Sequence, residues 1–189
     1  MLRMSATDSR IAGIAANLFH EHGITATGVD ALSRAAGVSK RTLYEKFENK
    51  DGLVTAAFDS LDLPVFEYFT HAAERNASDP IGQLDQLFAV MEKAVRLPGF
   101  HGCAFVNATA ELADAEHPAH LIVRRHKRRF QRWMRDRAQS AGLTDPDRVA
   151  RQLMVVLDGA QARAMVERSP KPVRDARDIA RALIDAARA

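Results

Sequence analysis

The segment Val29–Phe47 has the pattern of two short helices joined by a tight turn, and it restricts the possible fold more than any other part of the chain. Each helix has one apolar face, formed by Leu32, Ala35 and Ala36 in the first and by Leu43 and Phe47 in the second. Gly37 can adopt the positive φ that ends a helix, and Ser39 is suited to the N-cap of the next one. The segment is therefore predicted to fold as a helix-turn-helix.

The second of these helices begins with the polar residues Lys40, Arg41 and Thr42. Their side chains have the length and the donor groups needed to reach phosphates and the edges of bases. An ordinary amphipathic helical hairpin would explain the apolar spacing, but not the cap, the turn and the basic start together. The combination favours a module that binds double-stranded DNA.

The residues around this motif resemble the N-terminal domain of the tetracycline-repressor family of bacterial regulators. The resemblance is carried by residues 16–27, by residues 36–44, by Phe47 and by residues 49–53, and it covers roughly the first sixty residues. One position departs from the family pattern, because Arg41 stands where a small residue, commonly Gly, is often found. The family's usual contact at this position is therefore not carried over to Arg41.

The motif and the resemblance together give a set of predicted DNA contacts. They are Thr27, Ser39, Lys40, Arg41, Thr42, Tyr44 and Lys50. Tyr44 and Lys50 match family positions that usually contact phosphate, and a cation in the first turn of a helix, like Lys50, opposes the helix dipole unless an anion is bound. Thr27 is expected to offer its hydroxyl and nearby backbone N–H groups to another phosphate.

Three further basic residues lie near the motif, and the favoured interpretation gives none of them a role in DNA binding. Lys46 is expected to be a solvated surface charge. Arg3 and Arg10 could form an arm along the DNA backbone, but an ordinary chain terminus is the favoured interpretation.

Composition excludes several classes of protein. The 189 residues are 47% hydrophobic with a net charge of +3, so a full core is possible and any affinity for DNA must come from local clustering of charge. A single cysteine excludes an intrachain disulfide framework and suits a reducing cytoplasm. We find no signal peptide, membrane span, cofactor motif, catalytic set or metal-spaced Cys/His cluster, and therefore expect a soluble cytoplasmic protein that is not an enzyme.

Helical periodicity continues through the chain, and no alternating strand pattern occurs. An all-α fold is predicted, with an N-terminal three-helix DNA-binding domain over residues 1–50 and a helical ligand-binding and dimerisation domain over residues 51–189. Pro64 is predicted to kink or split a helical stretch from Asp51 to Arg75. Later helices are expected at about Cys103–Glu116, Pro118–Ser140, Asp147–Arg168 and Val173–Arg188.

The family resemblance implies that the last two helices form a homodimer. Their apolar positions are Val149, Leu153, Val156, Leu157, Ala160 and Ala164 in the first and Ala176, Ile179, Ala180, Leu183 and Ala187 in the second. Small residues in both faces permit close packing across a twofold axis. Completion of an intramolecular core is the alternative, and only the resemblance favours the dimer.

A small-molecule pocket is predicted among two helices of the second domain. Its candidate residues are Cys103, Asn107, Glu111, His126, Phe130 and Trp133. The first three are spaced by four, as on one helix face, and the resemblance includes a similar Gly-Cys…Asn…Glu pattern. Cys103 is either a packed hydrophobe, which is favoured, or a reactive thiol, and His126 is either a satisfied core histidine, again favoured, or a pocket residue.

The predicted helix 118–140 carries many arginines, but it is not interpreted as a nucleic-acid stripe. Its apolar residues mark a buried face, and arginines that cover the rest commonly extend over a core. Pairing with acidic residues elsewhere, or contact with an anionic ligand, remain as alternatives.

These observations favour a dimeric transcriptional regulator, a repressor that binds a palindromic operator and is released by a small-molecule inducer of unknown identity. A helical small-molecule-binding or enzymatic bundle with a vestigial DNA reader is the alternative from another class. A non-specific architectural DNA protein is disfavoured by the modest net charge.

Overall fold

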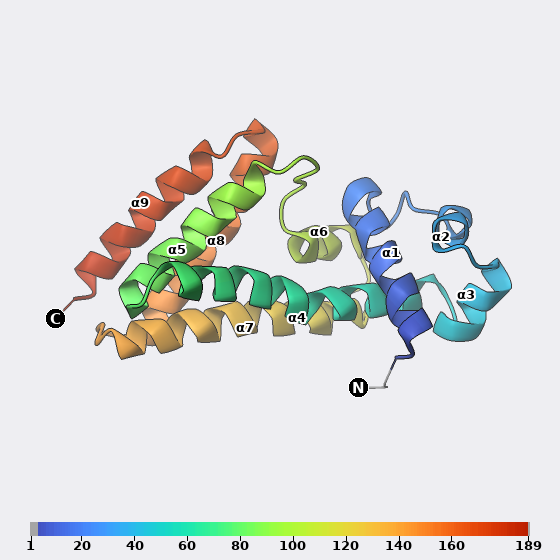
Figure 1. Ribbon diagram of the computed structural model, residues 1–189, viewed down its shortest axis with the longest axis horizontal. Helices are drawn as coiled ribbons and strands as arrows, with labels where there is room; N and C mark the ends of the chain where they lie inside the picture. Colours follow the sequence, from blue (N-terminus) through green and yellow to red (C-terminus); the bar gives the residue numbers. More distant parts are fainter. Residues whose placement is uncertain (1–3, 189) are drawn as a thin grey trace. The chain divides into compact units, whose positions relative to one another are not determined.

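The computed structural model describes residues 4–188, and within them every helix or strand that is assigned is an α-helix (Figure 1). The helices are α1 (Ala6–His22), α2 (Val29–Ala36), α3 (Lys40–Phe47), α4 (Lys50–Asn76), α5 (Pro80–Val95), α6 (Ala104–Glu111), α7 (Ala119–Ser140), α8 (Pro146–Glu167) and α9 (Lys171–Ala186). The predicted all-α fold is confirmed. Arg3, one of the two residues considered for an N-terminal arm, lies outside the described residues.

The chain divides into two compact units. One contains the residues up to Pro64 together with Ala104–His126, and the other contains Val65–Cys103 together with the residues from Lys127 onward. Helices α4 and α7 each contribute residues to both units. This division reflects which residues pack together. The predicted boundary at residue 50 instead separates a DNA-binding domain from a ligand-binding and dimerisation domain, and it stays a prediction.

In the first unit, local capping and one ion pair hold α1 in place. Ser5 and Asp8 form a capping box, in which each side chain accepts from the backbone N–H of the other residue. Lys46 donates to Asp8 at 2.5 Å, and this hydrogen bond, with that from Ser5, holds the pKa of the Asp8 carboxyl below its ordinary value. Lys46 is exposed, as expected of a surface charge, and through Asp8 it also links α3 to α1. Arg10 likewise donates to the carbonyl of Ala36 at the end of α2, at 3.0 Å.

The second unit is built around α5, α8 and α9. Asp79 and Asp145 cap α5 and α8, and each is followed by a proline at the first helical position, as the sequence predicts. Helices α5 and α9 lie side by side (Figure 1). Asp85 of α5 accepts from Nε of Arg177 at 2.7 Å and from Nε of Arg181 at 2.8 Å, so an ion-pair cluster borders the apolar contact.

Most of the residues predicted for a dimer interface instead complete the core of the second unit. Those fully buried within the chain are Val149, Leu153, Leu157, Ala160, Ala164, Ala176, Ala180 and Ala187. Ile179 is exposed, and Val156 and Leu183 are partly buried. The apolar periodicity could not separate an inner face from an outer one, because both contain small aliphatic residues.

Helix α4 continues through Pro64, so of the two predicted alternatives, a kink or a split, the split is excluded. One predicted helix boundary needs correction. The helix predicted to reach Glu116 ends at Glu111. Asp114 accepts from the backbone N–H of Glu116 at 2.9 Å, and such a local side-chain bond favours a turn over a further helical turn.

No helix within residues 4–188 is both long enough and apolar enough to cross a membrane.

We predict that Asp85→Asn lowers the free energy of unfolding near pH 7 by about 1–3 kcal/mol, because hydrogen bonds between charged groups are lost. Burial alone would raise the pKa of the Asp85 carboxyl, but hydrogen bonds and charge from Arg177 and Arg181 outweigh it and hold the pKa below its ordinary value of 3.8. Because this folded-state pKa is depressed, the stabilisation is fully present above pH 3.8 and is lost as the pH falls through the folded-state value.

Urea unfolding of wild type and variant between pH 7 and pH 2.5 measures this effect, and the difference between the two proteins should shrink at the acid end. Asp178→Asn, which removes an exposed partner of Arg181, is the control and should change stability little. A constant difference across the pH range would contradict the assignment.

Candidate functional sites

The turn between α2 and α3 is fixed by one glycine and one cap. Gly37 has φ 65° and ψ 34°, the left-handed conformation that a side chain disfavours. Ser39 lies at the N-cap of α3, and its hydroxyl accepts from the backbone N–H of Thr42 at 3.0 Å. The hydroxyl of Ser33 donates to the carbonyl of Val38 and ties the turn to α2. The predicted roles of Gly37 and Ser39 in this turn are confirmed.

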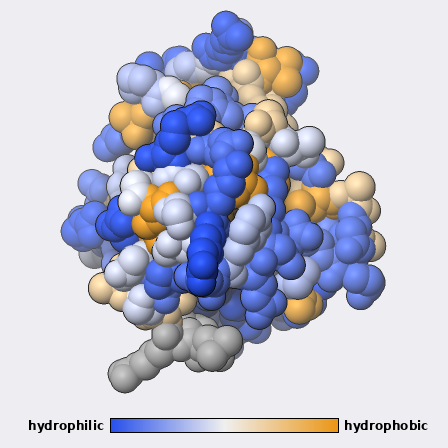
Figure 2. All heavy atoms as spheres, turned by 90° about the vertical axis from the view of Figure 1, so that its right-hand side faces the viewer, coloured by the Kyte–Doolittle hydropathy of each residue, from blue (hydrophilic) through white to orange (hydrophobic). Residues whose placement is uncertain are grey.

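The polar side of α3 is open. Leu43 and Phe47 are buried against the unit's core, whereas Ser39, Lys40, Arg41 and Tyr44 are exposed and Thr42 is half-buried. Figure 2 shows that the face carrying α2 and α3 is covered mainly by hydrophilic residues. The Arg41 side chain is 88% exposed, so its guanidinium is available to an external partner.

Two of the predicted contact residues form surface ion pairs. Lys40 lies 2.6 Å from Asp30 of α2, and Arg41 donates to Glu45 one turn later at 2.7 Å. Pairs this exposed contribute about 0–1 kcal/mol, so exchange of the carboxylate for a phosphate or a base edge is not prevented.

The position of Thr27 does not suit the predicted contact between its hydroxyl and a phosphate. It is 3% exposed, and its hydroxyl donates to the carbonyl of Gly23 at the end of α1, at 2.6 Å. The hydroxyl is therefore committed to the chain's own backbone, and any phosphate contact at this residue is left to the N–H groups at the start of α2.

Lys50 is held beside the end of α3 by a close backbone approach that sequence reasoning missed. Asn49 caps α4, with its side-chain oxygen 2.8 Å from the N–H of Gly52. A Cβ atom at Gly52 would lie only 2.0 Å from the carbonyl oxygen of Phe47, so no larger residue fits without movement of the backbone. Lys50 itself is in the first turn of α4, as predicted, and no ion pair is recorded for it within residues 4–188.

Three of the predicted ligand-binding residues belong to the first unit. Asn107 is half-buried on α6. Glu111, at the end of α6, accepts from the backbone N–H of Thr25 at 3.0 Å. His126 is buried, with Phe105 stacked on its ring at a centroid distance of 3.6 Å.

A buried acid–base cluster holds His126. Its Nδ1 lies 2.9 Å from one carboxylate oxygen of Asp62, and the other oxygen accepts from Nε of Arg125 at 2.6 Å. Arg125 also donates to Asp59, and this hydrogen bond raises the pKa of the guanidinium more than that from Asp62 does. His126 is thus satisfied by protein partners, which agrees with the favoured interpretation.

The other three ligand candidates belong to the second unit. Phe130 and Trp133 are part of its core, and the indole N–H of Trp133 donates to Glu74 at 2.8 Å. Cys103 is half-buried, with Sγ 3.4 Å from Nζ of Lys127.

Lys127 also donates to Asp158 at 2.5 Å, so the amine lies between a thiol and a carboxylate. Burial alone would lower the pKa of Lys127, but its interactions with Cys103 and Asp158 raise it overall. Sequence reasoning missed Lys127, Asp158 and Glu74 because no local pattern marks them as partners.

The chain matches two models of known families. Residues 13–57 match the model described as "Bacterial regulatory proteins, tetR family", and residues 80–180 match "Tetracyclin repressor-like, C-terminal domain". The curated transcriptional regulator AcuR of Cereibacter sphaeroides is 29% identical over 171 residues, which cover 85% of this chain and 78% of AcuR.

Solved structures of similar proteins agree with these matches. The structure of SCO4454, a TetR-family transcriptional regulator from Streptomyces coelicolor, has a TM-score of 0.86 at 29% identity and covers 97% of this chain and 90% of that one. The structure of sav143 from Streptomyces avermitilis has a TM-score of 0.84 at 32% identity, and the match covers 97% of this chain and 98% of that one.

Members of this family are transcriptional regulators and not enzymes, and ligand-responsive repression is their general role. They bind DNA operators, usually as dimers and with small-molecule ligands. With a helix-turn-helix at its start and a matching helical C-terminal domain, this chain belongs to the tetracycline-repressor family.

Proposed function

We propose that this chain is a cytoplasmic repressor that binds a palindromic operator as a homodimer and releases it when a small molecule binds. The open polar start of α3, held by Gly37 and Ser39, is the observation that carries this proposal. Each α3 would lie in a major groove, and the two half-sites would be about 34–36 Å apart.

Release would follow if the inducer favours a conformer with the wrong spacing of the two readers. The coupling can be no larger than the difference in the inducer's affinity for the two conformers. Gel-shift experiments with the DNA upstream of the chain's own gene test operator binding. A protein whose DNA reader is vestigial would bind that DNA no better than a random duplex.

The dimer interface is proposed on the outer side of α8 and α9. A groove of about 380 Å³ is lined there by Arg151, Gln152, Val155, Val156, Ile179 and Leu183. Val155 and Ile179 are 73% and 51% exposed, and exposed aliphatic residues that share one groove are typical of an interface between subunits.

The residues that the sequence predicts for ligand binding are kept as proposed inducer contacts: Asn107, Glu111 and His126 in the first unit, and Cys103, Phe130 and Trp133 in the second. Asn107 would orient a polar group of the inducer. Glu111 and His126 already have protein partners, so their part would be to fix the walls of the site.

The substitutions Arg41→Ala and Lys50→Ala are predicted to reduce operator binding in different ways. If Arg41 reads a guanine edge, its loss should cost about 1–3 kcal/mol at the operator and relax base preference. Lys50→Ala should weaken binding to all DNA sequences alike, and it should reduce the slope of the logarithm of the binding constant against the logarithm of the salt concentration by about one unit per site. Fluorescence anisotropy with operator and random duplexes over a range of salt measures both effects. An equal loss of affinity for both duplexes in Arg41→Ala would show that Arg41 does not contact bases specifically.

The double variant Val155→Arg/Ile179→Arg is predicted to be monomeric at micromolar concentration and to lose most operator affinity, because two unpaired charges would be placed in the interface. Sedimentation velocity and anisotropy provide the two measurements. Leu97→Arg, at a position 59% exposed outside the groove, is the control and should remain dimeric. A wild type that sediments as a monomer would rule out the proposed interface.

The substitution Asn107→Leu is predicted to abolish induction while operator affinity stays within a few-fold. The test uses a reporter strain and an inducer found by screening the wild type. Thr109→Leu, at an exposed position of the same helix, should respond as wild type. Trp133→Ala is less suitable, because removal of a buried Trp costs about 3–5 kcal/mol of stability.

The same reporter separates the two interpretations of Cys103. Cys103→Ser should retain the response to a non-covalent inducer, whereas a response to an added electrophile, N-ethylmaleimide, should disappear if the thiol is the sensor. If Asn107→Leu and Cys103→Ser both respond as wild type, the pocket lies elsewhere.

A further inference from the structure

Helix α7 carries far more positive than negative charge. Its cationic residues are Arg124, Arg125, Lys127, Arg128, Arg129, Arg132, Arg135 and Arg137, and its one acidic residue is Asp136. Several of these cations have acidic partners on other helices: Arg125 pairs with Asp59 and Asp62, Lys127 with Asp158, and Arg137 with Glu74. Such partners explain part of the charge but not all of it.

Arg128 and Arg132 are the residues of interest, because the structure records no ion pair for either within residues 4–188 and both are exposed. With Arg135 they are spaced by four and three residues, so all three lie on one side of α7. The ion pair recorded for Arg135 within residues 4–188 is with its neighbour Asp136, at 2.7 Å. Like charges at this spacing destabilise a helix unless something compensates them.

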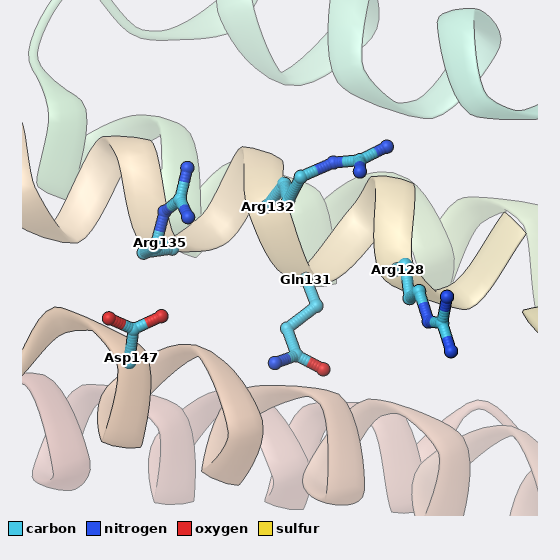
Figure 3. Close-up of a pocket in the computed structure, with 5 residues that line it drawn as sticks. All are labelled: Arg128, Gln131, Arg132, Arg135 and Asp147. Carbon is cyan, nitrogen blue, oxygen red and sulfur yellow. The ribbon is translucent and has the colours of Figure 1, made fainter. Parts of the chain in front are cut away.

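These arginines line one groove together with two polar residues. The groove has a volume of about 140 Å³ and is lined by Arg128, Gln131, Arg132, Arg135 and Asp147. Figure 3 shows Gln131 pointing from α7 towards α8 and Asp147 pointing from α8 back towards α7, while the side chains of Arg132 and Arg135 point away from α8. No apolar or aromatic residue is among the lining set, so the groove differs in kind from a pocket for an apolar inducer.

The size of the groove limits what it can hold. Pockets for drug-sized ligands have volumes of roughly 300–1,000 Å³, so a space of about 140 Å³ suits a compact ionic group. Guanidinium groups present paired N–H donors that match the oxygens of a phosphate, and two of the three here are not engaged by a carboxylate. Asp147 adds an acceptor, which suits a hydroxyl group and not a second anion.

We propose that this groove binds the phosphoryl group of a small phosphate ester, with Arg128 and Arg132 as the principal donors. The side chains of Arg132 and Arg135 would turn towards the bound group, Arg135 would add a third charge, and Asp147 would accept from a hydroxyl of the ester. The site is formed by α7 and the start of α8, and none of the residues assigned to operator binding takes part in it.

Isothermal titration with glycerol 3-phosphate, at constant ionic strength set by sodium chloride, tests the proposal on the full-length protein. We expect saturable binding that Arg132→Gln and Arg128→Gln each weaken at least tenfold. Arg132→Lys should recover only part of the loss, because an ammonium group keeps the charge but not the fork. Arg124→Gln is the control: Arg124 is also an exposed arginine of α7, but it does not line the groove, so its variant should bind as wild type.

Inorganic phosphate distinguishes the ester from the free ion. It should compete with glycerol 3-phosphate but bind more weakly, and Asp147→Asn should narrow that difference by removal of the hydroxyl acceptor. Circular dichroism melting of each variant checks that the fold is intact.

Three results would overturn the proposal. One is the absence of saturable binding of glycerol 3-phosphate to the wild type. Another is a loss of affinity in Arg124→Gln as large as that in Arg132→Gln. The third is binding of a short DNA duplex, but not of glycerol 3-phosphate, that depends on Arg128 and Arg132. That result would mean that these arginines bind a polyanion.

Discussion

The backbone turn at Gly37 and Ser39 is the constraint on which the DNA-binding surface depends. A left-handed residue ends α2, and the hydroxyl of Ser39 satisfies an N–H that α3 would otherwise leave without a partner. These two groups determine where α3 begins. Because successive helical residues are rotated by about 100°, a start displaced by one residue would turn Lys40 and Arg41 away from the open face and bring Leu43 out of the core.

A different kind of constraint acts on the cations of α7. Arg125 and Lys127 have acceptors on neighbouring helices, whereas Arg128 and Arg132 line a groove and no ion pair is recorded for either within residues 4–188. An unpaired arginine at an exposed site lowers the stability of the fold only slightly. A paired and partly buried arginine contributes more to stability, because removal of either partner leaves the other charge poorly solvated. One basic helix can therefore stabilise the bundle on one side and remain available to an anion on the other.

Local features of this chain could be predicted from its sequence, and long-range partners could not. The caps at Ser39 and Asp79 and the glycine at the end of α2 each depend on a few adjacent residues. The acceptor of Arg125, in contrast, lies 63 residues away in the chain, and the N–H that Glu111 contacts lies 86 residues away. Spacing on one helix shows which residues share a face, but not which helix that face meets. For this reason the predicted ligand residues were found to have protein partners that the sequence did not reveal.

The cluster around His126 limits how an inducer could use that residue. Asp62 holds the imidazole through Nδ1 and holds Arg125 through its second oxygen, and Phe105 covers one face of the ring. A ligand that displaced Asp62 would have to supply a new partner for Nδ1 of the buried His126, since a buried polar group left without a partner costs about 1–3 kcal/mol, and Arg125 would keep only Asp59 as an acceptor. An inducer without such a polar group can therefore be accommodated in this part of the first unit only if the cluster stays intact. Its recognition would then depend on shape and on Asn107 more than on His126.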